Sequence, residues 1–153
     1  MNKVFKVGLI GCGHIAETYF RGHKYFKNYR IIACSDINEK AAIRCAKHYK
    51  IKAKKIKELL NDNNLEVILN LTTPQDHYSV AKKILLASKH VYSEKPLATF
   101  FKEGKKLVQL AKKKSLYIGN APDTFLGGGG QKTKELIENG LIGDVKLGNT
   151  IFA

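Results

Sequence analysis

Residues 4–16 read Val-Phe-Lys-Val-Gly-Leu-Ile-Gly-Cys-Gly-His-Ile-Ala, an apolar run that leads directly into a glycine-rich turn. A short aliphatic run of this kind is typical of a buried strand. The next six residues fit the pattern Gly-x-Gly-x-x-Gly/Ala, in which Gly11 permits a tight turn, Gly13 lets the backbone approach a pyrophosphate and Ala16 lets a helix pack against the strand. The pattern therefore predicts a strand, a turn and a helix whose amino end binds a dinucleotide. The residues expected around its phosphates are Gly11, Cys12, Gly13, His14 and Ile15.

Strand-like runs and stretches of helical periodicity alternate along the first 120 residues. Further strands are expected at 30–35, 67–71, 90–92 and 116–118, with a weaker one near Ala53, and helices at 75–87 and 99–113. Strands that alternate with helices predict βαβ units. The expected fold is an α/β, Rossmann-type, doubly wound and mostly parallel sheet with helices on both faces, formed by residues 1–120.

The last part of the chain does not fit the same unit. Residues 121–144 are expected to form a glycine-rich loop, mobile at 127–130, and a linking helix at 131–139. A new strand-like run then spans 145–152. Because an unpaired strand leaves its hydrogen-bonding groups unsatisfied, this run is expected either to join the edge of the sheet or to start a further domain at 145–153.

Asp36 indicates which dinucleotide binds. It follows Ala16 by 20 residues, at the end of the second expected strand, where a carboxylate accepts hydrogen bonds from a ribose diol. A carboxylate there repels the 2′-phosphate of NADP, and residues 37–39 contain no arginine to offset it. NAD is therefore favoured over NADP, although Lys40 could support some NADP binding and Asp36 could instead cap the helix beginning near Asn38.

Composition and charge argue against a nucleic-acid-binding, a membrane-spanning or a metal-binding protein. The net charge of +14 raises nucleic-acid binding, but the basic residues are almost all lysine, with arginine only at positions 21, 30 and 44, and the lysines fall on polar faces of expected helices. No apolar run has the roughly 18 residues of a membrane span, and Lys3 and Lys6 interrupt any signal core, so a cytoplasmic protein is expected. Cys12, Cys34 and Cys45 show no metal-binding spacing and are expected to be reduced, packed thiols, with no metal site.

Three ordered segments resemble the Gfo/Idh/MocA family of oxidoreductases, which includes glucose–fructose oxidoreductase and inositol dehydrogenase. They are Gly11-Cys12-Gly13-His14-Ile15-Ala16, then Thr72-Thr73-Pro74-Gln75-Asp76-His77, then Lys89-His90-Val91-Tyr92-Ser93-Glu94-Lys95-Pro96-Leu97-Ala98. Each is expected at the carboxyl end of a strand, where open α/β sheets bind ligands. The resemblance implies hydride transfer between nicotinamide and a secondary alcohol of a sugar or cyclitol.

The resemblance also assigns roles to the second and third segments. Thr72, Thr73, Pro74 and His77 match positions near the nicotinamide end of the cofactor, although a structural role for His77 is also possible. Lys95 matches the catalytic lysine, whose ammonium group can hydrogen-bond the substrate oxygen and stabilise the charge that develops there. Glu94 would anchor ribose or orient Lys95, and Pro96 is expected to follow a cis peptide bond. These residues join Asp36 and the glycine turn in the expected site.

Two departures limit what the resemblance carries. Residues 121–130, including Asp123, differ from the segment common in the family, so the substrate cannot be carried over. The family's Asp-x-x-x-His pair, from a substrate domain that usually also forms a homo-oligomer interface, occurs nowhere in this chain. An NAD-binding module working with a partner chain and an NAD-dependent sugar hydrolase or dehydratase therefore remain alternatives.

Overall fold

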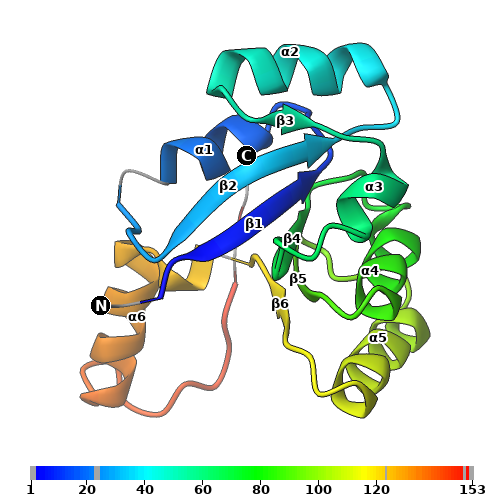
Figure 1. Ribbon diagram of the computed structural model, residues 1–153. Helices are drawn as coiled ribbons and strands as arrows, with labels where there is room; N and C mark the ends of the chain where they lie inside the picture. Colours follow the sequence, from blue (N-terminus) through cyan, green and yellow to red (C-terminus); the bar gives the residue numbers. More distant parts are fainter. Residues whose placement is uncertain (1–2, 23–24, 123, 150, 152–153) are drawn as a thin grey trace. The chain divides into compact units, whose positions relative to one another are not determined.

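The computed structural model describes residues 3–22, 25–122, 124–149 and 151, in two compact units that divide between Ala121 and Pro122. The first unit is an open twisted sheet covered by helices (Figure 1). The second holds a short 3₁₀ helix, η1 (Thr124–Leu126), and the helix α6 (Gly128–Glu138). None of the described helices combines the length and the apolar character that crossing a membrane requires.

Six parallel strands form the sheet in the order β3-β2-β1-β4-β5-β6. The order reverses between β1 and β4, which lie side by side although β2 and β3 separate them in the chain (Figure 1). This is the strand order of a Rossmann fold, and it opens a crevice at the carboxyl ends of β1 and β4. The strands are β1 (Phe5–Ile10), β2 (Tyr29–Ser35), β3 (Lys52–Ala53), β4 (Val67–Asn70), β5 (His90–Ser93) and β6 (Ile118–Asn120).

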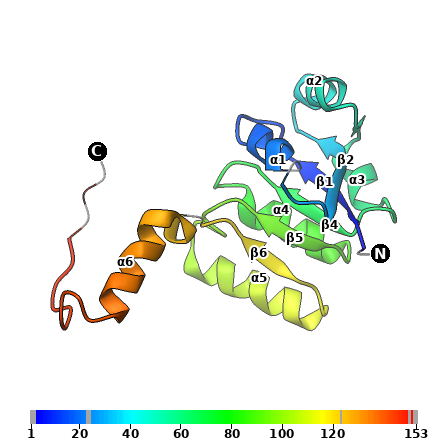
Figure 2. The same cartoon turned by 90° about the vertical axis from the view of Figure 1, so that its left-hand side faces the viewer.

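Helices cover both faces of the sheet, because alternate residues of each buried strand face opposite sides. Leu9 lies in one apolar cluster with Ala16 of α1 and Ala46 of α2, whereas its neighbour Ile10 lies in the other, with Ile84 of α4 and residues of α3 and α5 (Figures 1 and 2). The expected α/β fold is confirmed. The helices of this unit are α1 (Ala16–Gly22), α2 (Glu39–Tyr49), α3 (Ile56–Leu60), α4 (His77–Leu86) and α5 (Phe101–Lys113).

The last strand of the sheet begins later than its sequence suggests. It was expected at 116–118, but β6 spans Ile118–Asn120. Ser115 has a φ of 54°, and the N–H of Leu116 donates to the carbonyl of Ala111, so these residues finish the end of α5. The side chain of Leu116 still packs on the core from this connection, which is why it resembled a strand residue.

The second unit differs from two expectations. Gly128, Gly129 and Gly130 form the first turn of α6 (Gly128–Glu138) rather than a mobile loop. The N–H of Gln131 donates to Gly127, and the hydroxyl of Thr133 donates to the carbonyl of Gly129, so local bonds hold the turn. The strand expected at 145–152 is wrong for the described residues 145–149 and 151, which form no strand and are not part of the six-stranded sheet. Without a neighbouring strand to pair with, an extended run leaves its backbone groups unsatisfied, so this run is irregular. Asp123 and Phe152 lie outside the described residues.

Candidate functional site

A cleft of about 930 Å³ lies at the carboxyl ends of β1, β2 and β4, within the first unit. It occupies the crevice that the reversal of strand order predicts. Segments far apart in the sequence meet there, because parallel strands all end at the same edge. The expected cofactor residues that line it are Gly11, Gly13, His14, Ile15, Asp36, Thr72 and Thr73.

The two glycines of the turn meet different demands. Gly11 has a φ of +99°, and a Cβ atom on it would lie 2.4 Å from the carbonyl oxygen of Leu71. No side chain fits there without moving β4, so Gly11 is required by the fold. A Cβ on Gly13 would meet nothing within 4 Å, because this residue faces the open cleft. Gly13 is therefore free to be approached closely by a ligand.

Three consecutive backbone amides at the turn are unused. Among the described residues, no acceptor receives a hydrogen bond from the N–H groups of Gly13, His14 or Ile15. Amides in such a turn that have no protein acceptor are suited to bind an anion. The loop is also tied at its base, because the N–H of Gly11 donates to the carbonyl of Ser35 at 2.9 Å.

Asp36 holds the same loop through its side chain. One carboxylate oxygen accepts the N–H of Cys12 at 2.7 Å, and the other accepts the N–H of Asn38 at 2.8 Å. The cap of α2 is Asn38, whose side chain accepts from the N–H groups of Lys40 and Ala41, so Asp36 is not the helix cap. The carboxylate lines the cleft with lone pairs still available for a ligand.

Side-chain hydrogen bonds of two threonines order the segment that follows β4. The hydroxyl of Thr72 donates to the side-chain oxygen of Asn70 at 2.7 Å, and that of Thr73 donates to the carboxylate of Asp76, also at 2.7 Å. Pro74 is exposed, and its carbonyl accepts the N–H of His77 where α4 begins. The two threonines therefore present an ordered wall to the cleft.

His77 lies beneath this wall and not in it. Its side chain is only 1% exposed, and its two ring nitrogens lie 2.9 Å from the carbonyl oxygen of Thr72 and 2.5 Å from that of Pro96. The ring thus connects the segment after β4 with the segment after β5. Of the two roles weighed for His77, these contacts support the structural one.

The segment after β5 carries Glu94, Lys95 and Pro96. Glu94 accepts a hydrogen bond from the hydroxyl of Tyr19 at 2.8 Å and another from the backbone N–H of Lys95 at 3.1 Å. The peptide bond between Lys95 and Pro96 is cis, which confirms that expectation. The side chain of Lys95 is exposed, and among the described residues the hydrogen bond of Lys95 is made by its backbone N–H and not by its ammonium group. It is available to a ligand.

A buried amide network that sequence reasoning missed supports these segments. Asn70 is fully buried and donates to the carbonyl of His77 at 3.0 Å and to the hydroxyl of Ser93 at 3.3 Å. Asn120 donates to the carbonyls of Ser93 and Glu94, both at 3.0 Å. The available signal was an asparagine at the end of an otherwise apolar strand, because a buried amide needs partners.

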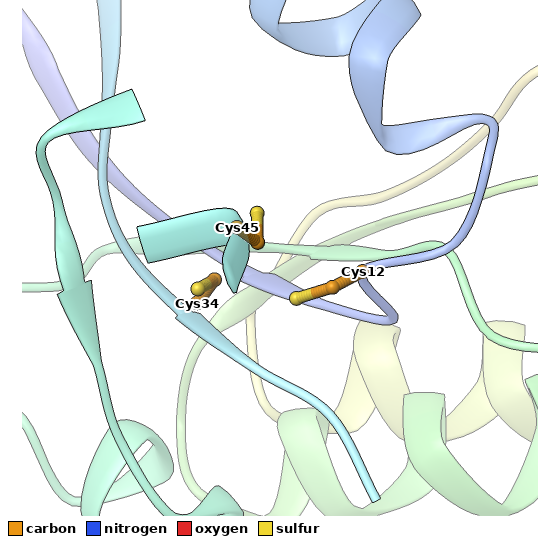
Figure 3. Close-up of side chains that lie close together, drawn as sticks. All are labelled: Cys12, Cys34 and Cys45. Carbon is orange, nitrogen blue, oxygen red and sulfur yellow. The ribbon is translucent and has the colours of Figure 1, made fainter. Parts of the chain in front are cut away.

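The three cysteines lie together beside the glycine turn (Figure 3). The sulfur atoms of Cys12, Cys34 and Cys45 all lie within 4.8 Å of one another, and none forms a disulfide. Hydrogen bonding to Cys12 and Cys34 lowers the pKa of Cys45 to about 4, whereas hydrogen bonding to the other two thiols and burial raise the pKa of Cys12. The sequence predicted reduced, mostly packed thiols and no metal site, and the spacing of these residues does not reveal that they converge.

Residues 5–121 match the family described as an oxidoreductase family with an NAD-binding Rossmann fold. The myo-inositol 2-dehydrogenase of Thermotoga maritima is 26% identical in an alignment of 144 positions that covers 90% of this chain and 42% of that enzyme. Overall, the chain spans less than half the length of the curated relatives that it matches.

Solved structures show the same relationship. The myo-inositol dehydrogenase of Lactobacillus casei, solved with NAD(H) and myo-inositol, superposes with a TM-score of 0.81 at 27% identity, covering 92% of this chain and 43% of that one. The biliverdin reductase of Synechocystis, solved with biliverdin and NADP⁺, has a TM-score of 0.79 at 27% identity over 87% of this chain and 42% of that one. The strand order, the glycine turn and the family match agree, and this chain belongs to the Gfo/Idh/MocA family of oxidoreductases through its NAD-binding Rossmann domain.

Proposed function

We propose that residues 1–121 bind NAD in the cleft, and that they form the cofactor-binding part of a dehydrogenase acting on a secondary alcohol of a sugar or cyclitol. The observation that carries the proposal is the row of amides at Gly13, His14 and Ile15, which have no acceptor in the described part of the chain, with open space in front of Gly13. A pyrophosphate supplies the acceptors that these amides lack.

The remaining walls of the cleft suit the other parts of the cofactor. Asp36 accepts hydrogen bonds from the adenine-side ribose and repels a 2′-phosphate, which favours NAD over NADP. Ile37, Ile43 and Ile56 line the same cleft with exposed side chains, and an adenine ring covers such apolar surface from water. Lys54 also lines the cleft, but its ammonium group forms an ion pair with Asp62 at 2.6 Å, so it is not free to bind a 2′-phosphate.

Lys95 is the proposed catalytic residue. When bound, nicotinamide accepts the hydride. Lys95 would hydrogen-bond the substrate oxygen through its exposed ammonium group and stabilise the negative charge that develops on that oxygen. Glu94 lies next to it, held by Tyr19, and would position the lysine or a ribose hydroxyl. Thr72, Thr73 and Pro74 would contact the nicotinamide end, with His77 fixing their segment from below.

The substrate class is proposed from the relatives. The Lactobacillus casei enzyme was solved with myo-inositol, and the Thermotoga maritima relative is a myo-inositol 2-dehydrogenase. A polyol ring presents the secondary alcohol that this chemistry needs. A cytoplasmic location and a homo-oligomeric full-length protein remain predictions.

Calorimetric titration of the 153-residue chain with NAD and with NADP, in separate experiments, tests the proposal. We expect one NAD per chain, with NADP binding at least about tenfold more weakly, because roughly 1.4 kcal/mol of charge repulsion at Asp36 corresponds to a tenfold change in affinity. If a folded chain binds neither dinucleotide, the proposed function is wrong. If NADP binds as tightly as NAD, the assignment of the cofactor is wrong and Asp36 does not select it.

A further inference from the structure

The thiol cluster consists of Cys12, Cys34 and Cys45, which are all the cysteines of the chain. Each comes from a different element: Cys12 from the turn after β1, Cys34 from β2 and Cys45 from α2 (Figure 3). Folding brings these three residues from distant positions to one point. Neither the hydride chemistry nor the binding of the dinucleotide requires three sulfur atoms there.

The spacing of the sulfur atoms fits a metal ion better than a disulfide. A Zn²⁺–sulfur bond is about 2.3 Å, so two sulfur ligands of one tetrahedral ion lie about 3.8 Å apart. All three sulfur atoms here are within 4.8 Å of one another, so no pair is more than about 1 Å farther apart than two zinc ligands would be. A disulfide requires a sulfur–sulfur distance of about 2.05 Å and joins only two atoms, which would leave the third thiol unexplained.

The backbone holds the cluster on one side and leaves it accessible on the other. Cys34 is fully buried, and its thiol donates to the carbonyl of Ala42 at 3.5 Å. The thiol of Cys12 donates to the carbonyl of Ser35 at 3.6 Å. Cys12 and Cys45 are partly exposed, so an ion can reach the sulfur atoms from their side. These thiol–carbonyl bonds are weak and are released when a metal replaces the proton.

The surrounding charge also favours a cation. The carboxylate of Asp36 accepts the N–H of Cys12, so a negative charge lies next to the thiol cluster. Among the described residues, no histidine or carboxylate completes the three-sulfur group, which leaves one coordination position for water or a small solute. Three protein ligands and one open position make a recognised form of zinc coordination.

We propose that Cys12, Cys34 and Cys45 bind a thiophilic divalent cation such as Zn²⁺ through three sulfur atoms, with one open coordination position. The ion would fix the conformation of the glycine turn, because Cys12 lies between Gly11 and Gly13. It would stand outside the hydride-transfer chemistry, since its ligands are at the phosphate end of the cleft and Lys95 is not among them.

Cobalt titration of the reduced, tag-free chain tests the site, because Co²⁺ binds like Zn²⁺ and absorbs light. We expect sulfur-to-cobalt charge-transfer absorption that saturates at one ion per chain and disappears when Zn²⁺ is added. Because this chain has no other cysteine, such a band reports on the thiol cluster alone. A folded, reduced chain that gives no such band at one equivalent overturns the proposal.

Variants separate the cluster from other ligands. Cys45→Ser changes a partly exposed side chain and should weaken cobalt binding by roughly 100-fold, since even the loss of a supporting contact costs metal sites tenfold to 100-fold. Cys34→Ala, checked by circular dichroism, should do the same. His48→Ala is the matched control, because His48 is an exposed potential ligand on the same helix. Binding that is lost in His48→Ala, or kept in both cysteine variants, contradicts a three-sulfur site.

Measuring the zinc content with and without NAD tests the metal site independently of dinucleotide binding. In a chain loaded with Zn²⁺, the proposed site predicts bound metal at one ion per chain whether or not NAD binds. Reduced chain that binds no Zn²⁺ but forms an internal disulfide under mild oxidation would instead identify a redox pair and overturn the metal site.

Discussion

The backbone N–H of Cys12 donates a hydrogen bond to the carboxylate of Asp36 at 2.7 Å, across 24 residues of sequence. This contact ties the glycine turn after β1 to the end of β2 before any ligand is present. One carboxylate therefore has two tasks: it holds the phosphate-binding turn and it faces the place proposed for the ribose. The two tasks can be separated by substitution.

Asp36→Asn removes the negative charge and keeps one side-chain oxygen, which can accept the N–H of Cys12 but not that of Asn38 as well. We expect the preference for NAD over NADP to fall by roughly tenfold, because the repulsion of the 2′-phosphate is lost while the turn is kept. Calorimetric titration with both dinucleotides measures the ratio. Asp144→Asn makes the same change at an exposed carboxylate outside the cleft and should leave the ratio unaltered. An unchanged ratio in Asp36→Asn would show that another group selects the cofactor.

Gly13→Val and Gly11→Ala should affect different properties. A side chain at Gly13 enters open space in the cleft, so NAD binding should be lost while the free energy of unfolding changes little. A side chain at Gly11 meets the carbonyl of Leu71 at a positive φ, so the chain should lose about 2 kcal/mol or more of stability. Urea denaturation and NAD titration of both variants check this. Equal destabilisation by the two changes would contradict the separate roles.

Lys95→Ala should impair turnover and not cofactor binding. In the proposed dehydrogenase, we expect the rate to fall by roughly 100-fold or more, which is the scale of losing a proton-transfer or oxyanion partner, with NAD affinity kept within severalfold. Lys102→Ala, an exposed lysine on α5, is the matched control and should retain its activity. Normal turnover of Lys95→Ala would remove Lys95 from the proposed chemistry.

Asp62 should make stability depend on pH in the acid range. The hydrogen bond from Lys54, with further bonds from Asn64, lowers the pKa of Asp62 to about 2. Since a folded-state pKa below the unfolded value of about 3.9 stabilises the charged form, this contribution is complete above pH 4 and is lost as the pH falls toward 2. Allowing for solvent screening, it amounts to about 1 kcal/mol.

Urea denaturation across this pH range tests the role of Asp62. Asp62→Asn should be less stable than the unchanged chain at pH 7, and the difference should shrink as the pH falls through the range from 4 to 2. Lys54→Ala removes the main cause and should show the same reduced pH dependence. A difference that stays constant with pH would mean that the ion pair contributes nothing.

The features that the sequence predicts well are those that neighbouring residues determine. The strand–turn–helix around Gly11 is encoded in thirteen consecutive residues, and the period of alternation separated strands from helices in the first unit. The cis bond before Pro96 followed from family resemblance and not from composition. Local pattern also explains the errors: Leu116 is apolar because it packs on the core from a connection, and the glycines at 128–130 become helical because a following helix extends through them.

Features that depend on distant residues meeting were not predictable. Asn70, Ser93 and Asn120 form one network only because β4, β5 and β6 are adjacent in the sheet. Cys12, Cys34 and Cys45 converge for the same reason, from a turn, a strand and a helix. The spacing of residues in the sequence does not predict such long-range contacts, because strand register and helix position arise from the packing of the whole sheet.

The position of the His77 ring between the carbonyls of Thr72 and Pro96 has a dynamic consequence. The segments after β4 and β5 both bond to the same buried imidazole, so they cannot fluctuate independently. Their backbone amides should therefore exchange with solvent as one cooperative unit. The segment that carries Lys95 should therefore be rigid and should not move as a lid over the cleft. Any closing motion around a bound molecule has to originate in another part of the protein.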